Sequence, residues 1–179
     1  MIPIILTSLW MWALIIERLF FFRRMSKEDV NLKQAVEMLS KERLPGAFRG
    51  IRTSIVRNFL TNRSGDKKLD QSLLEQFAMK ERPYIRRSLS VIAVLAAVAP
   101  LFGLLGTVTG MITTFDVISL FGTGNAKAMA GGISEALITT QSGLMVAIPG
   151  LFMSAFLYRR ASRLEGRLDE LVMTLKRYV

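Results

Sequence analysis

The sequence contains no cysteine and no histidine among its 179 residues. The missing cysteine excludes disulfides, thiolate nucleophiles and cysteine-ligated metal sites. The missing histidine removes the commonest general base and the commonest zinc ligand. Most hydrolytic and metal-dependent chemistry is thereby excluded, and we expect no enzyme, catalytic residue, cofactor or metal site.

Charge is nearly absent from three stretches of the chain. Residues 88–115 carry no charged side chain, and residues 128–158 carry only Glu135. Residues 1–22 are uncharged except for Glu17 and Arg18, and they lack the basic start and the cleavage site of a signal peptide. Apolar runs of this length are typical of transmembrane helices. With a mean hydropathy of +0.36, we predict an all-α membrane protein with three transmembrane helices at these positions.

The positive charge lies outside the predicted spans. Residues 23–88 hold 16 Lys and Arg against 8 Asp and Glu, and residues 159–179 hold 6 against 3. The connection 116–127 has only Asp116 and Lys127. By the positive-inside rule, residues 23–87 and 159–179 are cytoplasmic, whereas residues 116–127 and the N-terminus are periplasmic. Membrane topology therefore accounts for the net charge of +10 without nucleic-acid binding.

The cytoplasmic region is expected to be helical and to carry no chemistry. Residues 26–29 resemble a capping box, and a helix is expected from about residue 47 to 60, with a turn at 63–66. A further helix is expected to run from Leu69 straight into the second span, kinked at Pro83. The expected apolar faces are Ile51, Ile55, Val56 and Phe59 in one helix and Leu164, Leu168, Leu171 and Leu175 in the basic tail, which should prolong the third span.

Glu135 begins a polar stripe in the third span. Thr139 and Ser142 follow at i+4 and i+7 on the same helix face, and Thr140 widens the stripe. An acid at the centre of a span costs roughly 2.5 kcal/mol or more and usually marks an ion pathway. A carboxylate removed from water favours its protonated form, which makes Glu135 a candidate proton carrier. The alternative is an interfacial acid near the outer mouth, because Asn125, the expected N-cap, lies only about 15 Å of helix rise away.

The second span carries a matching stripe of small and polar residues: Gly103, Thr107, Gly110 and Thr114. Gly106 and Gly110 form a GxxxG motif that allows close helix packing. Pro100 and Pro149 each free one backbone carbonyl, which neighbouring helices or water can satisfy. Three spans cannot enclose such a polar surface, so we expect the chain to oligomerise or to surround a partner helix.

Two segments carry a family resemblance. APLFGLLGTVTGMITTF (residues 99–115) and AGGISEALITTQSGLMVAIPG (residues 130–150) resemble the MotA/TolQ/ExbB proton-channel family, in its ExbB/TolQ branch. The resemblance implies a pentamer in the bacterial inner membrane around the single spans of an ExbD/TolR-type partner. Such an assembly uses proton-motive force to energise a TonB- or TolA-like protein that acts on the outer membrane. It also implies Glu135 as the pore-facing acid, with Thr107 and Thr140 as polar pore residues.

The chain departs from the family pattern at two points. Met153 and Ser154 stand where an aromatic–Asn pair is common, and the first span begins almost at residue 1. The ExbB-like and TolQ-like alternatives stay open, and a MotA-like assignment is weaker because that branch resembles a four-span layout. The functional alternative is a non-conducting scaffold whose polar stripes only bind a partner helix.

Overall fold

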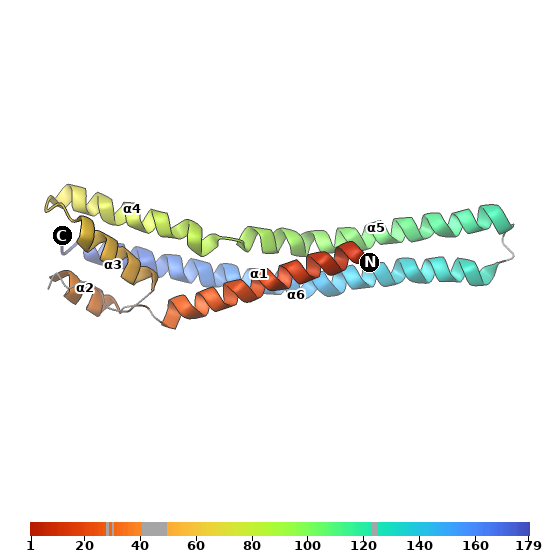
Figure 1. Cartoon of the computed structure of the whole chain (residues 1–179), viewed down its shortest axis with the longest axis horizontal. Helices are drawn as coiled ribbons and strands as arrows, with labels where there is room; N and C mark the ends of the chain where they lie inside the picture. Colours follow the sequence, from red (N-terminus) through yellow and green to blue (C-terminus); the bar gives the residue numbers. More distant parts are fainter. Residues whose placement is uncertain (28, 30, 41–49, 123–124) are drawn as a thin grey trace. The chain divides into compact units, whose positions relative to one another are not determined.

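The computed structural model describes residues 1–27, 29, 31–40, 50–122 and 125–179, and this part of the chain is helical without strands. The helices are α1 (Ile2–Lys27), α2 (Leu32–Ser40), α3 (Ile51–Asn62), α4 (Lys67–Arg86), α5 (Leu89–Phe121) and α6 (Ala126–Leu175) (Figure 1). Within these described ranges, three segments are long and apolar enough to cross a membrane, namely Ile2–Met25, Lys67–Phe121 and Ala126–Leu175. The prediction of an all-α membrane protein with three long apolar helices is confirmed at this level.

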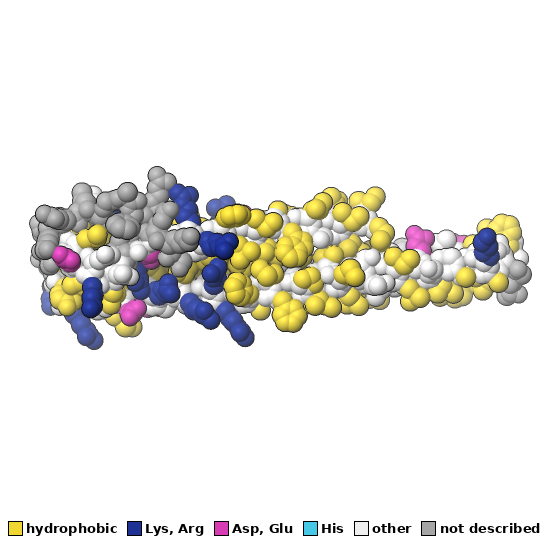
Figure 2. Space-filling view, turned by 90° about the horizontal axis from the view of Figure 1, so that it is seen from below, with side chains coloured by type: hydrophobic (Ala, Val, Ile, Leu, Met, Phe, Trp, Pro, Cys, Tyr) yellow, Lys and Arg dark blue, Asp and Glu magenta, His cyan; other side chains and the backbone are white. Residues whose placement is uncertain are grey.

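The chain divides into two compact units. The apolar unit comprises Met1–Ile16 and Ser88–Phe156, and the charged unit comprises Glu17–Arg87 and Leu157–Val179. Figure 2 shows hydrophobic side chains over much of the visible surface of the first and Lys and Arg side chains gathered on the second. Helices α1 and α6 contribute residues to both units.

In the apolar unit, α5 and the first part of α6 run side by side in opposite directions (Figure 1). Gly122 ends α5 with a positive φ of 66°, a backbone conformation that glycine adopts without a steric cost. Asn125 then caps α6 as predicted, because its side-chain oxygen accepts a hydrogen bond from the Ala128 N–H at 3.1 Å. The connection is shorter than the sequence suggested, since residues 116–121 continue α5.

The charged unit has a core of aliphatic and aromatic side chains. Both predicted apolar faces are buried: Ile51, Ile55, Val56 and Phe59 in α3, and Leu164, Leu168, Leu171 and Leu175 in α6. Leu74, Ala78 and Ile85 of α4 and Phe22 of α1 are buried as well. Burial at three- and four-residue intervals explains why α6 continues as a helix beyond the predicted span.

The helix starts of the charged unit differ from the prediction. α3 begins at Ile51, and residues 47–49 of the expected helix lie outside the described residues, as does Glu28 of the expected capping box. One half of a capping box forms instead at α2, where the Gln34 side chain accepts a hydrogen bond from the Asn31 N–H. Asp29 caps a different helix, because its carboxylate accepts a hydrogen bond from the Arg52 N–H at the start of α3.

The expected continuous helix from Leu69 into the second span is wrong. Pro83 lies inside α4, and the interruption comes after Arg86, where Ser88 adopts a left-handed backbone with φ of 62° before α5 begins. A left-handed residue cannot continue the α-helical hydrogen-bond pattern. Arg87 already leaves the helical conformation with a ψ of 138°, so the Tyr84 carbonyl is not followed by a helical N–H at position 88. This carbonyl accepts a hydrogen bond from the buried Arg18 guanidinium at 3.1 Å instead.

Candidate functional site

Glycine residues bring α5 and α6 into close contact in the apolar unit. A Cβ placed on Gly106 would lie 2.5 Å from Thr139 Oγ1, and one on Gly110 would lie 2.9 Å from the Ala136 Cβ. On the opposing helix, a Cβ on Gly143 would lie 2.8 Å from the Ala99 carbonyl oxygen. Only a missing side chain allows these backbones to approach so closely, which is how membrane helices pack in the absence of a hydrophobic driving force.

The remaining packing residues of the prediction occupy the same pair of helices. A Cβ on Gly103 would lie 3.1 Å from the Thr139 carbonyl oxygen. Pro100 and Pro149 lie inside α5 and α6, which both continue through them. Gly150 faces α1, since a Cβ there would meet the side chain of Met11. The small residues therefore position α5, α6 and the first part of α1 against one another.

Three of the predicted pathway threonines lie within this contact. Thr139 and Thr114 are buried, and their hydroxyls donate hydrogen bonds to the Ala136 carbonyl at 2.7 Å and the Gly110 carbonyl at 3.0 Å. The Thr140 hydroxyl donates across the helix pair to the Gly103 carbonyl at 3.3 Å. Each of these hydroxyl groups donates its hydrogen bond to a backbone carbonyl, so the threonines can pack in the helix contact without leaving a buried polar group unpaired.

Glu135 and Thr107, unlike Thr139, are not buried in the contact between α5 and α6. Glu135 is exposed, and no hydrogen bond or ion pair links it to any other described residue. Thr107 is half-buried and donates to the Leu104 carbonyl of its own helix at 2.6 Å. Ser142 is half-exposed, donates to the Ile138 carbonyl, and lines a cavity of about 270 Å³ beside Ile4 and Ser8 of α1.

The predicted stripe is therefore divided. Thr139 lies against α5, Ser142 lies toward α1, and Glu135 is left on the surface of the single chain. Glu135 is the only charged residue between positions 128 and 158, and neither residues 88–115 nor residues 128–158 contain a basic residue that could pair with it. Such an acid, held on a tightly packed helix pair, can bind and release a proton if a neighbouring molecule covers it.

A ladder of ion pairs joins α4 to the last part of α6 in the charged unit, and the sequence prediction missed it. Arg86 binds Glu165 through two hydrogen bonds of 2.6 and 2.7 Å, and Arg82 binds Asp169 at 2.6 Å. Further along, Lys176, which directly follows the end of α6, pairs with Glu75 of α4. Residue numbers rise along α4 as they fall along α6, which is the register of antiparallel helices.

The electrostatics of the Arg86–Glu165 pair follow from this geometry. The hydrogen bonds from Arg86 lower the pKa of the Glu165 carboxyl, and the positive charges of Arg86 and Arg82 add to this, against an opposing effect of burial. The same pair raises the pKa of Arg86. Both charges are therefore present at neutral pH, and they fix α6 against α4.

Arg18 is a further residue to which the sequence prediction assigned no role. Its side chain is 3% exposed, its guanidinium lies 5.0 Å from the centre of the Phe21 ring, and it binds the Tyr84 carbonyl that the break after α4 sets free. The only indication in the sequence was that Arg18 is a basic residue within the otherwise largely apolar stretch 1–22. Its partner could not be read from the sequence because it lies 66 positions away.

Comparisons with known proteins identify the family of the chain. The model of the MotA/TolQ/ExbB proton channel family matches residues 46–170, a range that includes α3, α4, α5 and most of α6. The chain is similar to the ExbB-like 3 protein of Synechocystis sp., with 34% identity over 86% of this chain and 77% of that protein.

Two further bacterial proteins are similar to it as well. The biopolymer transport protein ExbB of Salmonella typhimurium is 26% identical over 95% of this chain and 76% of its own length. The ExbB protein of Aquifex aeolicus is 34% identical over 63% of this chain and 66% of its own length. With a family match over more than half of its residues and three apolar helices of spanning length, the chain belongs to the MotA/TolQ/ExbB proton channel family.

Proposed function

We propose that this protein is a subunit of a proton-driven motor in the bacterial inner membrane, with its N-terminus periplasmic and its C-terminus cytoplasmic. Glu135 carries the proton. The observation behind the proposal is that Glu135 is the only charged residue from 128 to 158 and is exposed on the single chain. Family membership and the names of the ExbB relatives support a role in transport rather than catalysis.

The pathway residues are proposed in two groups. Glu135 and Thr107 face outward or are half-exposed, which leaves them available to a neighbouring subunit or partner. Thr140, half-buried, lies at the edge of the α5–α6 contact and contributes from there. Thr139 and Thr114 hold the helix pair together through packing, and this supports the rigidity on which a moving partner depends. Ser142 lies next to α1 and belongs to the intrachain surface.

The proposed partners are those that would cover Glu135, which is exposed on the single chain. Several copies of the chain, in a ring such as a pentamer, would surround the single spans of an ExbD/TolR-type protein and shield Glu135 from lipid. Moving one proton charge through 100 mV releases about 2.3 kcal/mol, enough to bias a helix rotation or rocking motion. That motion would energise a TonB- or TolA-like protein acting on the outer membrane.

The test is a proton-flux measurement on the complex co-purified with its partner and reconstituted in vesicles. Glu135→Gln keeps the hydrogen-bonding shape of the side chain but cannot ionise, so we expect it to abolish flux while leaving the mass of the complex unchanged. Asp116→Asn is the matched control, because it removes an exposed acid of the same unit outside the predicted spans. It should retain flux.

The same pair of variants separates the motor from a scaffold. One observation favours the scaffold function, namely that Thr139, Thr140 and Thr114 make packing contacts and hydrogen bonds within the chain. If Glu135→Gln supports energised uptake at the level of the unaltered protein, no proton passes through Glu135 and the scaffold is the better account.

A further inference from the structure

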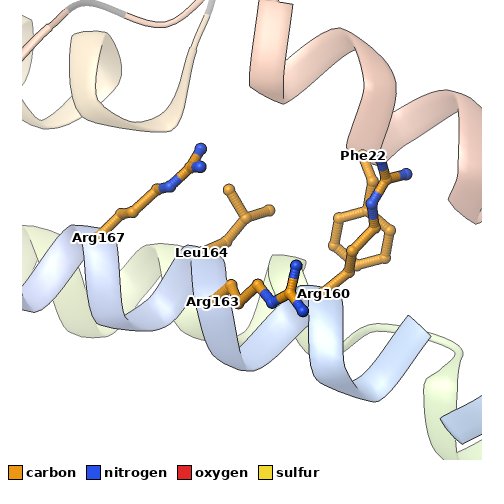
Figure 3. A pocket seen from close by; sticks show the side chains of 5 residues that line it. All are labelled: Phe22, Arg160, Arg163, Leu164 and Arg167. Atoms are coloured by element: carbon orange, nitrogen blue, oxygen red, sulfur yellow. The ribbon is translucent and has the colours of Figure 1, made fainter. Parts of the chain in front are cut away.

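A basic pocket lies in the charged unit between the last part of α1 and the segment of α6 that follows the predicted third span. Its volume is about 140 Å³, and it is lined by Phe22, Arg160, Arg163, Leu164 and Arg167. Figure 3 shows the three arginines and Leu164 rising from α6, with the Phe22 ring reaching down from α1. The pocket thus combines guanidinium groups with an apolar wall.

The acidic residues of this part of α6 are committed elsewhere. Glu165 binds Arg86 and Asp169 binds Arg82, both of them residues of α4. Arg163 and Arg167 form no side-chain ion pair or hydrogen bond with any residue that the structure describes. The guanidinium groups of Arg163 and Arg167 therefore carry charge that no described side chain neutralises, and their planar donor groups suit the oxygens of a phosphate.

The positions of the lining residues along their helices place the pocket at the membrane surface. Phe22 is the last residue of the predicted first span, and Arg160 comes two residues after the predicted end of the third. At about 1.5 Å per residue, Arg160 and Arg163 lie roughly 3 to 8 Å beyond the hydrocarbon edge. Arg160 and Arg163 therefore lie at the depth of the lipid headgroup layer, which adds about 5 to 8 Å on each side of the hydrocarbon core. Arg167 begins about 14 Å beyond the edge, so only its long side chain can extend back toward that layer.

We propose that this pocket binds the phosphodiester headgroup of an anionic phospholipid from the cytoplasmic leaflet. The arginines hold the phosphate oxygens, and Phe22 and Leu164 contact the glycerol and the first methylenes of the acyl chains. Basic pockets between membrane helices on the cytoplasmic side recognise headgroups in this way. The site goes beyond the proposed function, since it does not involve Glu135 or proton transfer, and only the choice of leaflet rests on the proposed orientation of the termini.

The first experiment uses the unaltered full-length chain in detergent. Native mass spectrometry measures the retention of phosphatidylglycerol, zwitterionic phosphatidylethanolamine and soluble glycerol phosphate in separate titrations. We expect phosphatidylglycerol to bind about tenfold or more tightly than the other two, because only it offers both the net charge and the apolar part. Equal retention of phosphatidylethanolamine, or equal binding of glycerol phosphate, would overturn the proposal.

The second experiment locates the site with two charge-matched double variants. Arg163→Gln with Arg167→Gln removes two arginines of the pocket. Arg23→Gln with Arg159→Gln removes two exposed arginines that adjoin lining residues in sequence but do not line the pocket. We expect about a tenfold loss of phosphatidylglycerol affinity in the pocket pair and less than about a twofold loss in the control pair.

Two results would contradict this assignment. Unchanged affinity in the pocket pair would show that the lipid binds elsewhere, and equal losses in both pairs would show that only net charge matters. All four arginines are exposed, so the helical circular dichroism of both variants should match that of the unaltered chain.

Discussion

The apolar unit and the charged unit are both built from packed helices, yet different interactions hold them. In the apolar unit, glycines of α5 and α6 lie against the facing helix, and Asp116, Lys127 and Glu135 form no ion pair among the described residues. In the charged unit, a buried leucine face is reinforced by two ion pairs between α4 and α6 and by a third between α4 and Lys176, which directly follows α6. Burying apolar surface away from lipid gives no hydrophobic stabilisation, so the first unit depends on close van der Waals contact between helices. The second unit is also stabilised by the hydrophobic effect, because its apolar side chains are buried away from water.

The largest expected effect comes from filling the helix contact of the apolar unit. In Gly143→Leu, the Cβ would lie 2.8 Å from the Ala99 carbonyl oxygen and 3.1 Å from the Gly103 Cα, and both are backbone atoms that cannot turn aside. We expect a loss of about 3 kcal/mol in the free energy of unfolding, from overpacking. Detergent-induced unfolding followed by circular dichroism measures it.

Gly131→Leu is the matched control on the same helix, because a Cβ at Gly131 meets nothing within 4 Å. It should be neutral or slightly stabilising, since leucine favours the helix over glycine. Equal stability of the two variants would mean that close approach of α5 and α6 is not what holds the apolar unit.

The next effect concerns the turn before α4. The buried Asp70 carboxylate accepts hydrogen bonds from the Ser64 N–H at 2.8 Å, the Ser64 hydroxyl at 3.0 Å and the Gly65 N–H at 3.2 Å. Asp70→Asn replaces one acceptor oxygen by a donor, and we expect it to cost about 1 to 2 kcal/mol of unfolding free energy. Asp116→Asn, an exposed residue of the apolar unit, should change the stability little.

The same carboxylate gives a pH dependence. Burial raises the pKa of Asp70, but the hydrogen bonds from Ser64 and Gly65 and the charge of Arg63 together hold it below the ordinary value. The stabilisation is therefore complete above the pKa of an aspartate in the unfolded chain and is lost as the pH falls through the lower pKa of the folded state. Acid titrations of the unaltered chain and of Asp70→Asn should converge at low pH, and parallel curves would contradict this.

The sequence predicted the positions of the helices better than it predicted which residues contact one another between helices. Long uncharged blocks and the leucine spacing of residues 164–175 correctly indicated long apolar helices and a buried face, because both patterns are local. The spacing of Glu135, Thr139 and Ser142 placed them on one side of α6, but only the positions of α5 and α1 decide which of them is covered. The partner of Glu165 is 79 positions away, and no local pattern identifies it.

The break at Ser88 was missed for a different reason. Serine is not a residue that marks a left-handed backbone, so a polar residue at the edge of an apolar block read as the start of the span. We expect Ser88→Gly to raise the unfolding free energy by about 0.5 to 1 kcal/mol, because glycine adopts a φ of 62° without the steric cost that serine bears.

Ser162→Gly is the control, for which we expect a change in the unfolding free energy of the opposite sign. Ser162 is an exposed residue inside α6, where glycine should lower the stability by a few tenths of a kcal/mol. Thermal unfolding of both variants in the same detergent measures the difference. A loss of stability in Ser88→Gly would contradict the left-handed conformation.

The smallest expected effect is that of an exposed ion pair, and it should be confined to the charged unit. Glu165→Gln removes the carboxylate that binds Arg86, and the loss should shrink as the salt concentration rises, because exposed charges are screened. The lowered pKa of Glu165 makes the contribution of the pair complete above the ordinary glutamate pKa and lost as the pH falls through the lower folded value. The loss on Gly143→Leu involves no charge, so salt should leave it unchanged. If both losses respond to salt in the same way, the division between packing in one unit and ion pairing in the other fails.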